Sequence, residues 1–337
     1  MFFCAIITCF TIPATMTSFP VTRHRPVIEK ATNLKTIQET APLILKDLSN
    51  LALKLAAFSQ DSTLPLYFRG NLMNIDWTDH VRNAGLALTL QQLAPYCSDK
   101  EASECVQKAA KSASRKIINT WPHDIQACSF SARALEPLDG KEIQNLRIYA
   151  ERASEQAIKG LLEPRFERGE VLISLCELKE SIYPDIRNQV NRAIISGLNP
   201  STWGPFSSQN IHEVFELNWY SQFLRAAHDA GFEVDQMSAK DAAFRLIDYA
   251  PLAAELETNF RVVTLEGISS LLPMLKNESE DTQKRIFIAI QKLLLSCLAP
   301  EAHVEGCEEA IAFIRGRTIR FDISGHFVSA LALLLAE

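Results

Sequence analysis

The chain has 337 residues, of which 47% are hydrophobic, and a net charge of −6 with both signs interspersed. This balance provides no basic stripe for a nucleic-acid groove, and beyond the N-terminus no apolar run reaches the roughly 18 residues of a membrane span. Only 12 glycines occur, and GxGxxG, GxxxxGK and GxSxG are all absent, which excludes dinucleotide-binding, P-loop and α/β-hydrolase sites.

Residues 1–26 are interpreted as a leader or a disordered segment that precedes one helical-repeat domain at residues 27–337. The apolar run at residues 2–10, followed by Ala14, has the length of a signal-peptide core, although no Lys or Arg precedes it. Met16 offers an alternative start. The sequence therefore leaves open whether the protein is cytoplasmic or is exported with residues 1–14 as its signal.

From about residue 28 onward, apolar residues recur with helical spacing and are interrupted by Pro and Gly at short intervals. Pro42 and Pro251 fall inside two of the expected helices and should kink or split them. The pattern predicts helices at residues 28–57, 76–94, 101–119, 124–136, 141–162, 168–181, 184–197, 212–230, 239–258, 262–275, 281–298, 303–315 and 323–336.

Two pairs of cysteines flank short connections between expected helices. They are Cys97 with Cys105 and Cys297 with Cys307. The ends of neighbouring helices can bring Cα atoms to the roughly 5–6 Å that a disulfide needs. Separate buried thiols are the alternative.

Every second helix begins in a similar way, with an acidic residue or an Arg ahead of a stretch of small and apolar residues. This position recurs after 43–61 residues, and the longest interval contains the additional helix expected at 303–315. The helices of this set are apolar over most of their surface, whereas the intervening ones are more charged and amphipathic. An inner and an outer layer follow from this difference. N-capping alone accounts for most of the acidic residues at the inner starts.

Six outer–inner helix pairs resemble the (α/α)6 toroid of six-hairpin glycosidases. The resemblance covers residues 28–337 and is architectural, because no family motif matches. It implies an all-α fold in which functional groups lie on loops and inner-helix starts at one mouth of the ring. The same layering also fits an open HEAT-like α-solenoid; the count of six favours the closed ring.

The first and last inner helices share the pattern Asp-x-[Ser/Thr]-x-His, in Asp76 with His80 and in Asp322 with His326. Residues i and i+4 lie on one helix face, so each Asp is expected to contact its own His. In a closed ring the two pairs would meet at the mouth. They would provide general acid–base catalysis or a divalent metal site at His80 and His326, whereas ordinary packing residues are the alternative.

Glu216 begins another inner helix and completes the expected catalytic set. It follows a long loop that contains Trp203 and Phe206, and an aromatic loop beside acidic helix starts would suit a sugar ring. The same loop would otherwise plug one end of the ring. The expected substrate-binding residues are Phe68, Arg69, Trp77, Trp203, Phe206, Glu213, Trp219, His303, Glu305 and Arg320.

Two functions are compatible with this sequence. The first is a hydrolase or lyase that acts on a small or carbohydrate-like ligand by acid–base chemistry, with no cofactor or, alternatively, the divalent metal described above. The second is a non-catalytic helical-repeat protein that binds a protein or peptide partner on the concave face of a solenoid. The sequence does not decide between them.

Overall fold

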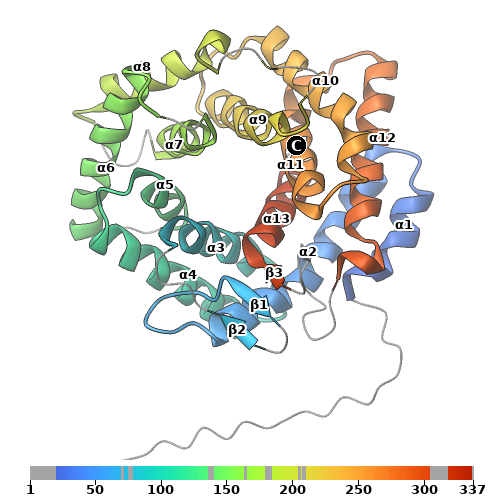
Figure 1. Ribbon diagram of the computed structural model, residues 1–337, viewed down its shortest axis with the longest axis horizontal. Coiled ribbons are helices and arrows are strands. Elements are labelled where there is room, and N and C mark those ends of the chain that lie inside the picture. Colours follow the sequence, from blue (N-terminus) through green and yellow to red (C-terminus); the bar gives the residue numbers. More distant parts are fainter. Residues whose placement is uncertain are drawn as a thin grey trace, which may run out of the picture.

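The computed structural model describes residues 20–69, 72–74, 79–135, 140–162, 165–178, 184–203, 206, 210–303 and 318–335. Within these residues the helices form two concentric layers (Figure 1). The inner layer contains α3 (His80–Leu93), α5 (Ile125–Arg133), α7 (Arg165–Leu178), α9 (Glu213–Asp229), α11 (Thr258–Leu275) and α13 (Phe321–Leu335). The outer layer contains α2 (Leu34–Ala57), α4 (Lys100–Thr120), α6 (Gly140–Ile158), α8 (Arg187–Leu198), α10 (Gln236–Ala253) and α12 (Glu280–Cys297).

The inner layer is a closed ring. Each inner helix packs against the next one along the chain, and the last, α13, packs against the first, α3. The predicted (α/α)6 toroid is therefore confirmed, and the alternative of an open solenoid is wrong. The protein partner proposed for the concave face of a solenoid loses its structural basis.

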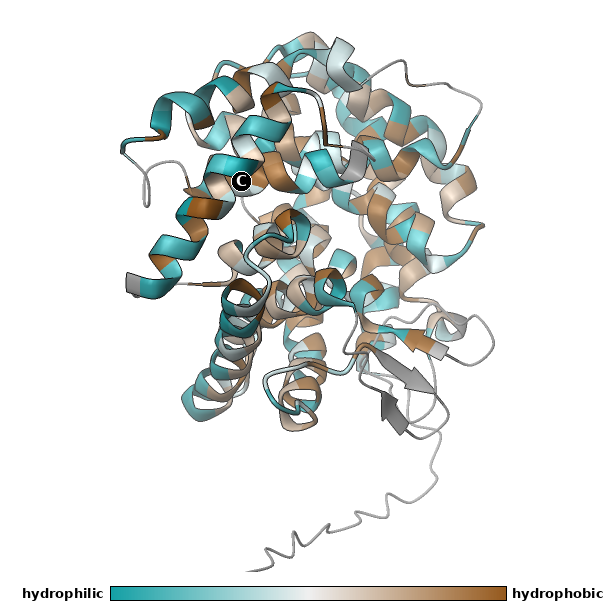
Figure 2. Ribbon diagram, turned by 60° about the vertical axis from the view of Figure 1, so that its left-hand side comes forward, coloured by the Kyte–Doolittle hydropathy of each residue, from teal (hydrophilic) through white to brown (hydrophobic). Residues whose placement is uncertain are grey.

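Burial separates the two layers in the way that the sequence pattern indicates. In α11, 14 of 18 residues are buried, because this helix packs on both sides. In α4, 6 of 21 residues are buried, and they form the single apolar stripe of an amphipathic helix. The outer helices accordingly carry hydrophilic residues on the surface of the molecule (Figure 2).

Aspartates cap several helix starts. The Asp79 side chain accepts a hydrogen bond from the Arg82 amide at the start of α3, and Asp124 accepts one from the Ala127 amide at the start of α5. These bonds satisfy backbone N–H groups that have no partner inside the helix. The first inner helix thus begins at His80, four residues after the expected start at Asp76.

A small antiparallel sheet joins the two ends of the ring. Strands β1 (Tyr67–Arg69), β2 (Leu72–Asn74) and β3 (Thr318–Arg320) have the order β2-β1-β3. β1 lies ahead of α3 and β3 lies directly ahead of α13, so their pairing holds the starts of these two inner helices side by side. Strands of three residues are too short for a readable alternating pattern.

The observed helices match the expected ones to within five residues at each end, with one difference. The segment expected as one helix at 28–57 consists of α1 (Arg25–Lys30) and α2, and the break lies at residues 31–33, where Asn33 caps α2. Pro42 lies inside the uninterrupted α2 and Pro251 near the end of α10. Of the helix expected at 303–315, His303 belongs to the described residues and the rest lies outside them.

The residues ahead of α1 already pack on the ring. They form the 3-10 helix η1 (Pro20–His24), in which Val21 and His24 are buried. Short 3-10 turns also occur at η2 (Ala94–Tyr96), η3 (Pro200–Trp203) and η4 (Pro300–Ala302). Among the helices in the described ranges, none has the length and apolar character that a membrane span requires.

The proposed disulfide between Cys97 and Cys105 is absent, because both are free thiols. Cys297 is a free, buried thiol, and its expected partner Cys307 lies outside the described residues. Burial raises the pKa of the Cys297 thiol to about 12, so this cysteine is an unreactive core residue.

Candidate active site

A cavity of about 470 Å³ lies inside the ring. Residues from the first turns of α3, α5, α9, α11 and α13 line it, so the starts of these inner helices gather around one mouth. Its volume is in the range of small-molecule binding sites. The charged lining residues are Arg82, Arg133, Glu216, Glu266, Arg320, Asp322 and His326.

Two arginines hold Asp322 at the mouth of the cavity. Arg320, the last residue of β3, donates to both carboxylate oxygens of Asp322 at 2.6 and 3.2 Å. Arg82 of α3 lies 3.5 Å from the same carboxylate and 2.8 Å from that of Asp79. The sheet that closes the ring thereby also places a charged group of the site.

His326 is held by a buried carboxylate. Its Nδ1 lies 2.8 Å from Oε2 of Glu266, whose side chain is 3% exposed, whereas the imidazole is 25% exposed. Burial lowers the pKa of His326, but the charge of Glu266 and its hydrogen bond outweigh burial, with a further contribution from Asp322 and an opposing one from Arg320. The net pKa is raised above its ordinary value. Within the described residues no group hydrogen-bonds to Nε2, the other ring nitrogen.

The raised pKa of His326 has a defined consequence for stability. Because the folded value exceeds the ordinary 6.5, folding favours the imidazolium. This contribution is complete below pH 6.5 and disappears as the pH rises through the folded pKa. Below the folded pKa, the imidazolium of His326 is therefore a proton donor beside the carboxylates of the site.

Aromatic rings form one wall of the cavity. The ring of Trp219 meets His326 edge-on at a centroid distance of 5.9 Å and meets Phe130 at the same distance. A second group lies near the start of α9, where His212 and Phe215 both contact Phe260 at centroid distances of 5.4 and 5.2 Å. Exposed faces of such rings can pack against the C–H face of a sugar.

Gly169 of α7 allows Trp219 to occupy this wall. A Cβ at position 169 would lie 2.4 Å from the Cβ of Trp219 and 3.2 Å from its backbone. Contacts this short force the two helices apart or displace the tryptophan. The position therefore excludes every side chain larger than that of glycine.

We expect Gly169→Ala to destabilise the protein by about 1–3 kcal/mol, the usual cost of overpacking, and to shift Trp219. Gly85→Ala is the matched control in the same cavity, because the nearest atoms to its Cβ lie 3.9 Å away on Phe130. This control should be neutral or stabilising by up to about 1 kcal/mol. Urea denaturation with tryptophan fluorescence measures both effects, and equal stability of the two variants would contradict the packing argument.

A layer of charged side chains lies beneath the cavity. Arg133 of α5 donates to both carboxylate oxygens of Glu170 on α7 at 3.0 and 3.1 Å, and to Glu177 at 2.8 Å. Glu170 is fully buried. Burial raises its pKa to about 7, even though Arg133 opposes this shift.

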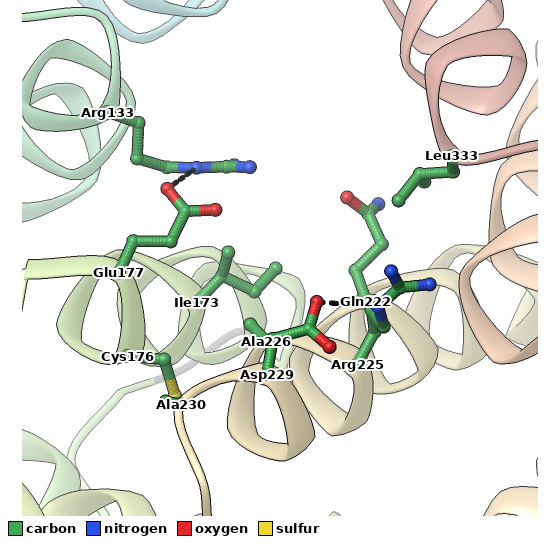
Figure 3. Close-up of a pocket in the computed structure, with 10 residues that line it drawn as sticks. All are labelled: Arg133, Ile173, Cys176, Glu177, Gln222, Arg225, Ala226, Asp229, Ala230 and Leu333. Atoms are coloured by element: carbon green, nitrogen blue, oxygen red, sulfur yellow. Dashed lines mark hydrogen bonds and ion pairs between the residues drawn. The ribbon is translucent and has the colours of Figure 1, made fainter. Parts of the chain in front are cut away.

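A second cavity of about 340 Å³ lies on the other side of this layer. It is lined by the later turns of α5, α7, α9 and α13, and Figure 3 shows Arg133 and Glu177 facing Gln222 and Arg225 across it. Arg133 and Gln222 line both cavities. A single layer of side chains therefore separates the two ends of the ring.

The structure brings together some of the expected site residues. Glu216, Asp322 and His326 of the expected catalytic set line the first cavity, together with Trp219 and Arg320 of the expected binding set. The predicted contact between Asp322 and His326 is replaced by separate partners, since Asp322 binds arginines and His326 binds Glu266. Asp76, Trp77 and Glu305, and the side chains of Phe68 and Arg69, lie outside the described residues.

The other expected residues are placed elsewhere. His80 contacts Trp121 with the two rings tilted at 37° and their centroids 3.6 Å apart, and Trp203 is fully buried. Phe206 packs against Tyr220 beside Trp203, Glu213 accepts a hydrogen bond from Tyr249, and His303 is buried. In the described part of the chain, no group of three or more His, Cys, Asp or Glu residues is arranged to hold a metal ion.

Several lining residues were not among the sequence candidates, notably Glu266, Arg82, Arg133 and Phe130. Glu266 carries a signal that could have been used. It is an acidic residue in the middle of the otherwise apolar and hydroxyl-bearing run at 262–272 of α11. A charged residue in a helix that is buried on all sides requires a partner, and such residues mark functional sites.

No family model matches the chain, and no curated protein matches it either. Among solved structures, unsaturated glucuronyl hydrolase from Streptococcus agalactiae aligns with a TM-score of 0.63, 13% identity and coverage of 96% of this chain and 98% of that chain. Two variants of that enzyme align with TM-scores of 0.61 and 0.57, at 13% and 12% identity, over 96% of this chain and 97% of theirs. These likenesses show the fold, an (α/α)6 toroid.

Proposed function

We propose that the first cavity is the active site of a hydrolase that cleaves a small carbohydrate by acid–base chemistry. The observation that carries this proposal is the Glu266–His326 pair, which lies in one cavity with two further carboxylates and an aromatic wall. The name of the structural neighbour, a hydrolase that acts on a glucuronyl sugar, supports the same substrate class.

In the proposed reaction His326 is the general acid. Its Nδ1–H is held by Glu266, so Nε2 is the nitrogen that would deliver a proton to the leaving oxygen as the glycosidic C–O bond breaks. A water molecule attacks the sugar carbon, and a carboxylate takes its proton. We assign this second role to Glu216 on α9, because Asp322 is held by two arginines and is better suited to fix charge and orientation at the mouth.

The cavity also contains charge for an acidic sugar. Arg82, Arg133, Arg320 and the imidazolium of His326 oppose the carboxylates of Glu216, Glu266 and Asp322. An incoming carboxylate would therefore meet cations at both the mouth and the inner end of the cavity. We include uronic-acid disaccharides among the proposed substrates for this reason.

The test is a turnover assay on neutral and uronic-acid disaccharides, including those with an unsaturated glucuronyl end. We expect Glu216→Gln to lower kcat by about 10²–10⁴-fold, the usual contribution of a general base. Glu257→Gln, which changes an exposed carboxylate at the start of inner helix α11, is the control and should keep wild-type activity. Absence of turnover and of ligand binding across the whole panel would refute the proposed function.

A further inference from the structure

A row of three hydrogen bonds, two buried and one part-buried, runs along the first cavity from α9 to α13. The Gln222 amide Nε2 donates to Oδ1 of Asn218 at 3.2 Å, and Nδ2 of Asn218 donates to Oε2 of Glu266 at 2.8 Å. The same Oε2 lies 2.8 Å from Nδ1 of His326. Asn218 is 0% exposed, Glu266 2% and Gln222 7%, so little of these groups is open to water.

The row has a fixed direction because each side-chain amide has one donor end and one acceptor end. Gln222 donates to the carbonyl of Asn218, which turns the Asn218 amino group toward Glu266. A carboxylate oxygen accepts hydrogen bonds, so the remaining contact of Oε2 is satisfied when Nδ1 of His326 carries the hydrogen. A neutral imidazole holds one ring hydrogen, which leaves the Nε2 lone pair free toward the cavity.

We propose that Asn218, oriented by Gln222, is a positioning residue that holds His326 in its Nδ1–H tautomer, with Nε2 as the atom that exchanges a proton with the ligand. The tautomer assignment stands on the hydrogen bonds alone, and its catalytic consequence rests on the proposed function. Asn218 acts only through Glu266 and does not line the cavity.

Close packing of α9 and α11 keeps the row in place. A Cβ on Gly267, the residue after Glu266, would lie 3.1 Å from the Cα of Asn218 and 3.4 Å from its Oδ1. The glycine thus lets the two backbones approach until the Asn218 amide reaches Glu266. With both helices fixed at this separation, the carboxylate has little freedom to turn away from His326.

The charged groups around His326 come from three elements. Glu266 belongs to α11, Asp322 to α13 and Arg320 to β3, whereas α9 packs the uncharged Trp219 against the ring and contributes Glu216 to the same cavity. Of these, Glu266 makes the hydrogen bond to the ring. The orientation of this one carboxylate therefore decides which nitrogen is protonated.

Imidazole ¹H–¹⁵N correlation spectra of the ¹⁵N-labelled full chain test the proposal, with His326 assigned by comparison with His326→Gln. At a pH above the titration of His326, we expect the wild type to show the hydrogen on Nδ1. In Asn218→Leu a substantial Nε2–H population should appear, and kcat should fall about tenfold or more with a smaller change in KM, as for other residues that orient a reactive group.

Gln222→Met is the second variant, and it removes the donor that orients Asn218. It carries the test if Asn218→Leu does not fold. Gln126→Met is the matched control, because Gln126 is also a side-chain amide that lines the cavity but it has no place in the row. In the ligand-free protein this control should leave the tautomer of His326 unchanged.

An Nε2–H tautomer in the wild type, or an unchanged tautomer in the folded variants of Asn218 and Gln222, would overturn the proposal. The spectra need no substrate, so they separate this inference from the proposed function. The expected tautomer together with no turnover of any sugar would leave the positioning role standing and refute the hydrolase. Turnover of a sugar, together with an unchanged His326 tautomer in the folded variants, would refute the positioning role and leave the hydrolase standing.

Discussion

Replacing His326 with glutamine is expected to lower kcat/KM by about 10²–10⁴-fold, because the cavity loses its proton donor. Glutamine retains a hydrogen-bonding side chain that can face Glu266, so the helix packing around α13 should survive. The raised pKa of His326 adds a pH signature. Wild-type kcat/KM should be sustained at pH 6.5 and should fall as the pH rises through the elevated pKa, where the imidazolium loses its proton.

Steady-state kinetics between pH 5 and pH 9 on the best substrate of the disaccharide panel measures both effects. His123→Gln is the control, since His123 is exposed and lies outside the cavity. Circular dichroism establishes that each variant is folded. A rate that increases as His326 loses its proton would show that the neutral imidazole acts as a base, and unfolding of the variant would assign His326 to core packing.

The largest effect on stability is expected for Arg133→Met. The side chain of Arg133 is 12% exposed, and its guanidinium pairs with the fully buried Glu170 and with Glu177. Removal of one partner from a buried ion pair costs about 3–5 kcal/mol, because the other charge remains buried without compensation. Lys159→Met, which removes an exposed i,i+4 pair with Glu155, should leave the free energy of unfolding close to that of the wild type, because solvent screens such pairs.

The cost of Arg133→Met should depend on pH with a predictable sign. The pKa of Glu170 is already about 7, above its ordinary 4.5, and loss of Arg133 raises it further. Because the pKa of Glu170 is higher in the folded state, the contribution of this group to stability is complete below pH 4.5. That contribution is lost as the pH rises through the folded pKa. Urea denaturation at pH 5 and pH 8 should therefore show the larger loss at pH 8, and an equal loss at both values would refute this account.

The sequence contains enough information to predict the layers of the fold. Helices with small and apolar residues all around, such as α11, can be stable only when packed on both sides, and charged ones such as α4 must lie outside. Six repeats then make ring closure a reasonable inference. Whether α13 reaches α3 depends on the angles between all the successive hairpins. Local periodicity in the sequence carries no information on these angles.

The site was predictable in part, and the failures have physical causes. His326 was identified, but its partner Glu266 lies 60 residues earlier in the chain and becomes adjacent only when α11 and α13 pack. The sequence pattern puts His80 one turn into a helix, whereas α3 begins at His80 itself, where the side chain contacts Trp121. The indole of Trp203 turns inward to donate to the carbonyl of Gly197, and a loop sequence does not reveal that direction.

The ladder between β1 and β3 has a consequence for how the chain reaches its native state. It pairs residues about 250 positions apart, so the last step of closure cannot occur until nearly the whole domain has been synthesised. Until α13 docks, the neighbouring faces of α3 and α11 lack their apolar cover. We therefore expect nascent or truncated chains that lack this final helix to be slow to mature and to depend on chaperones.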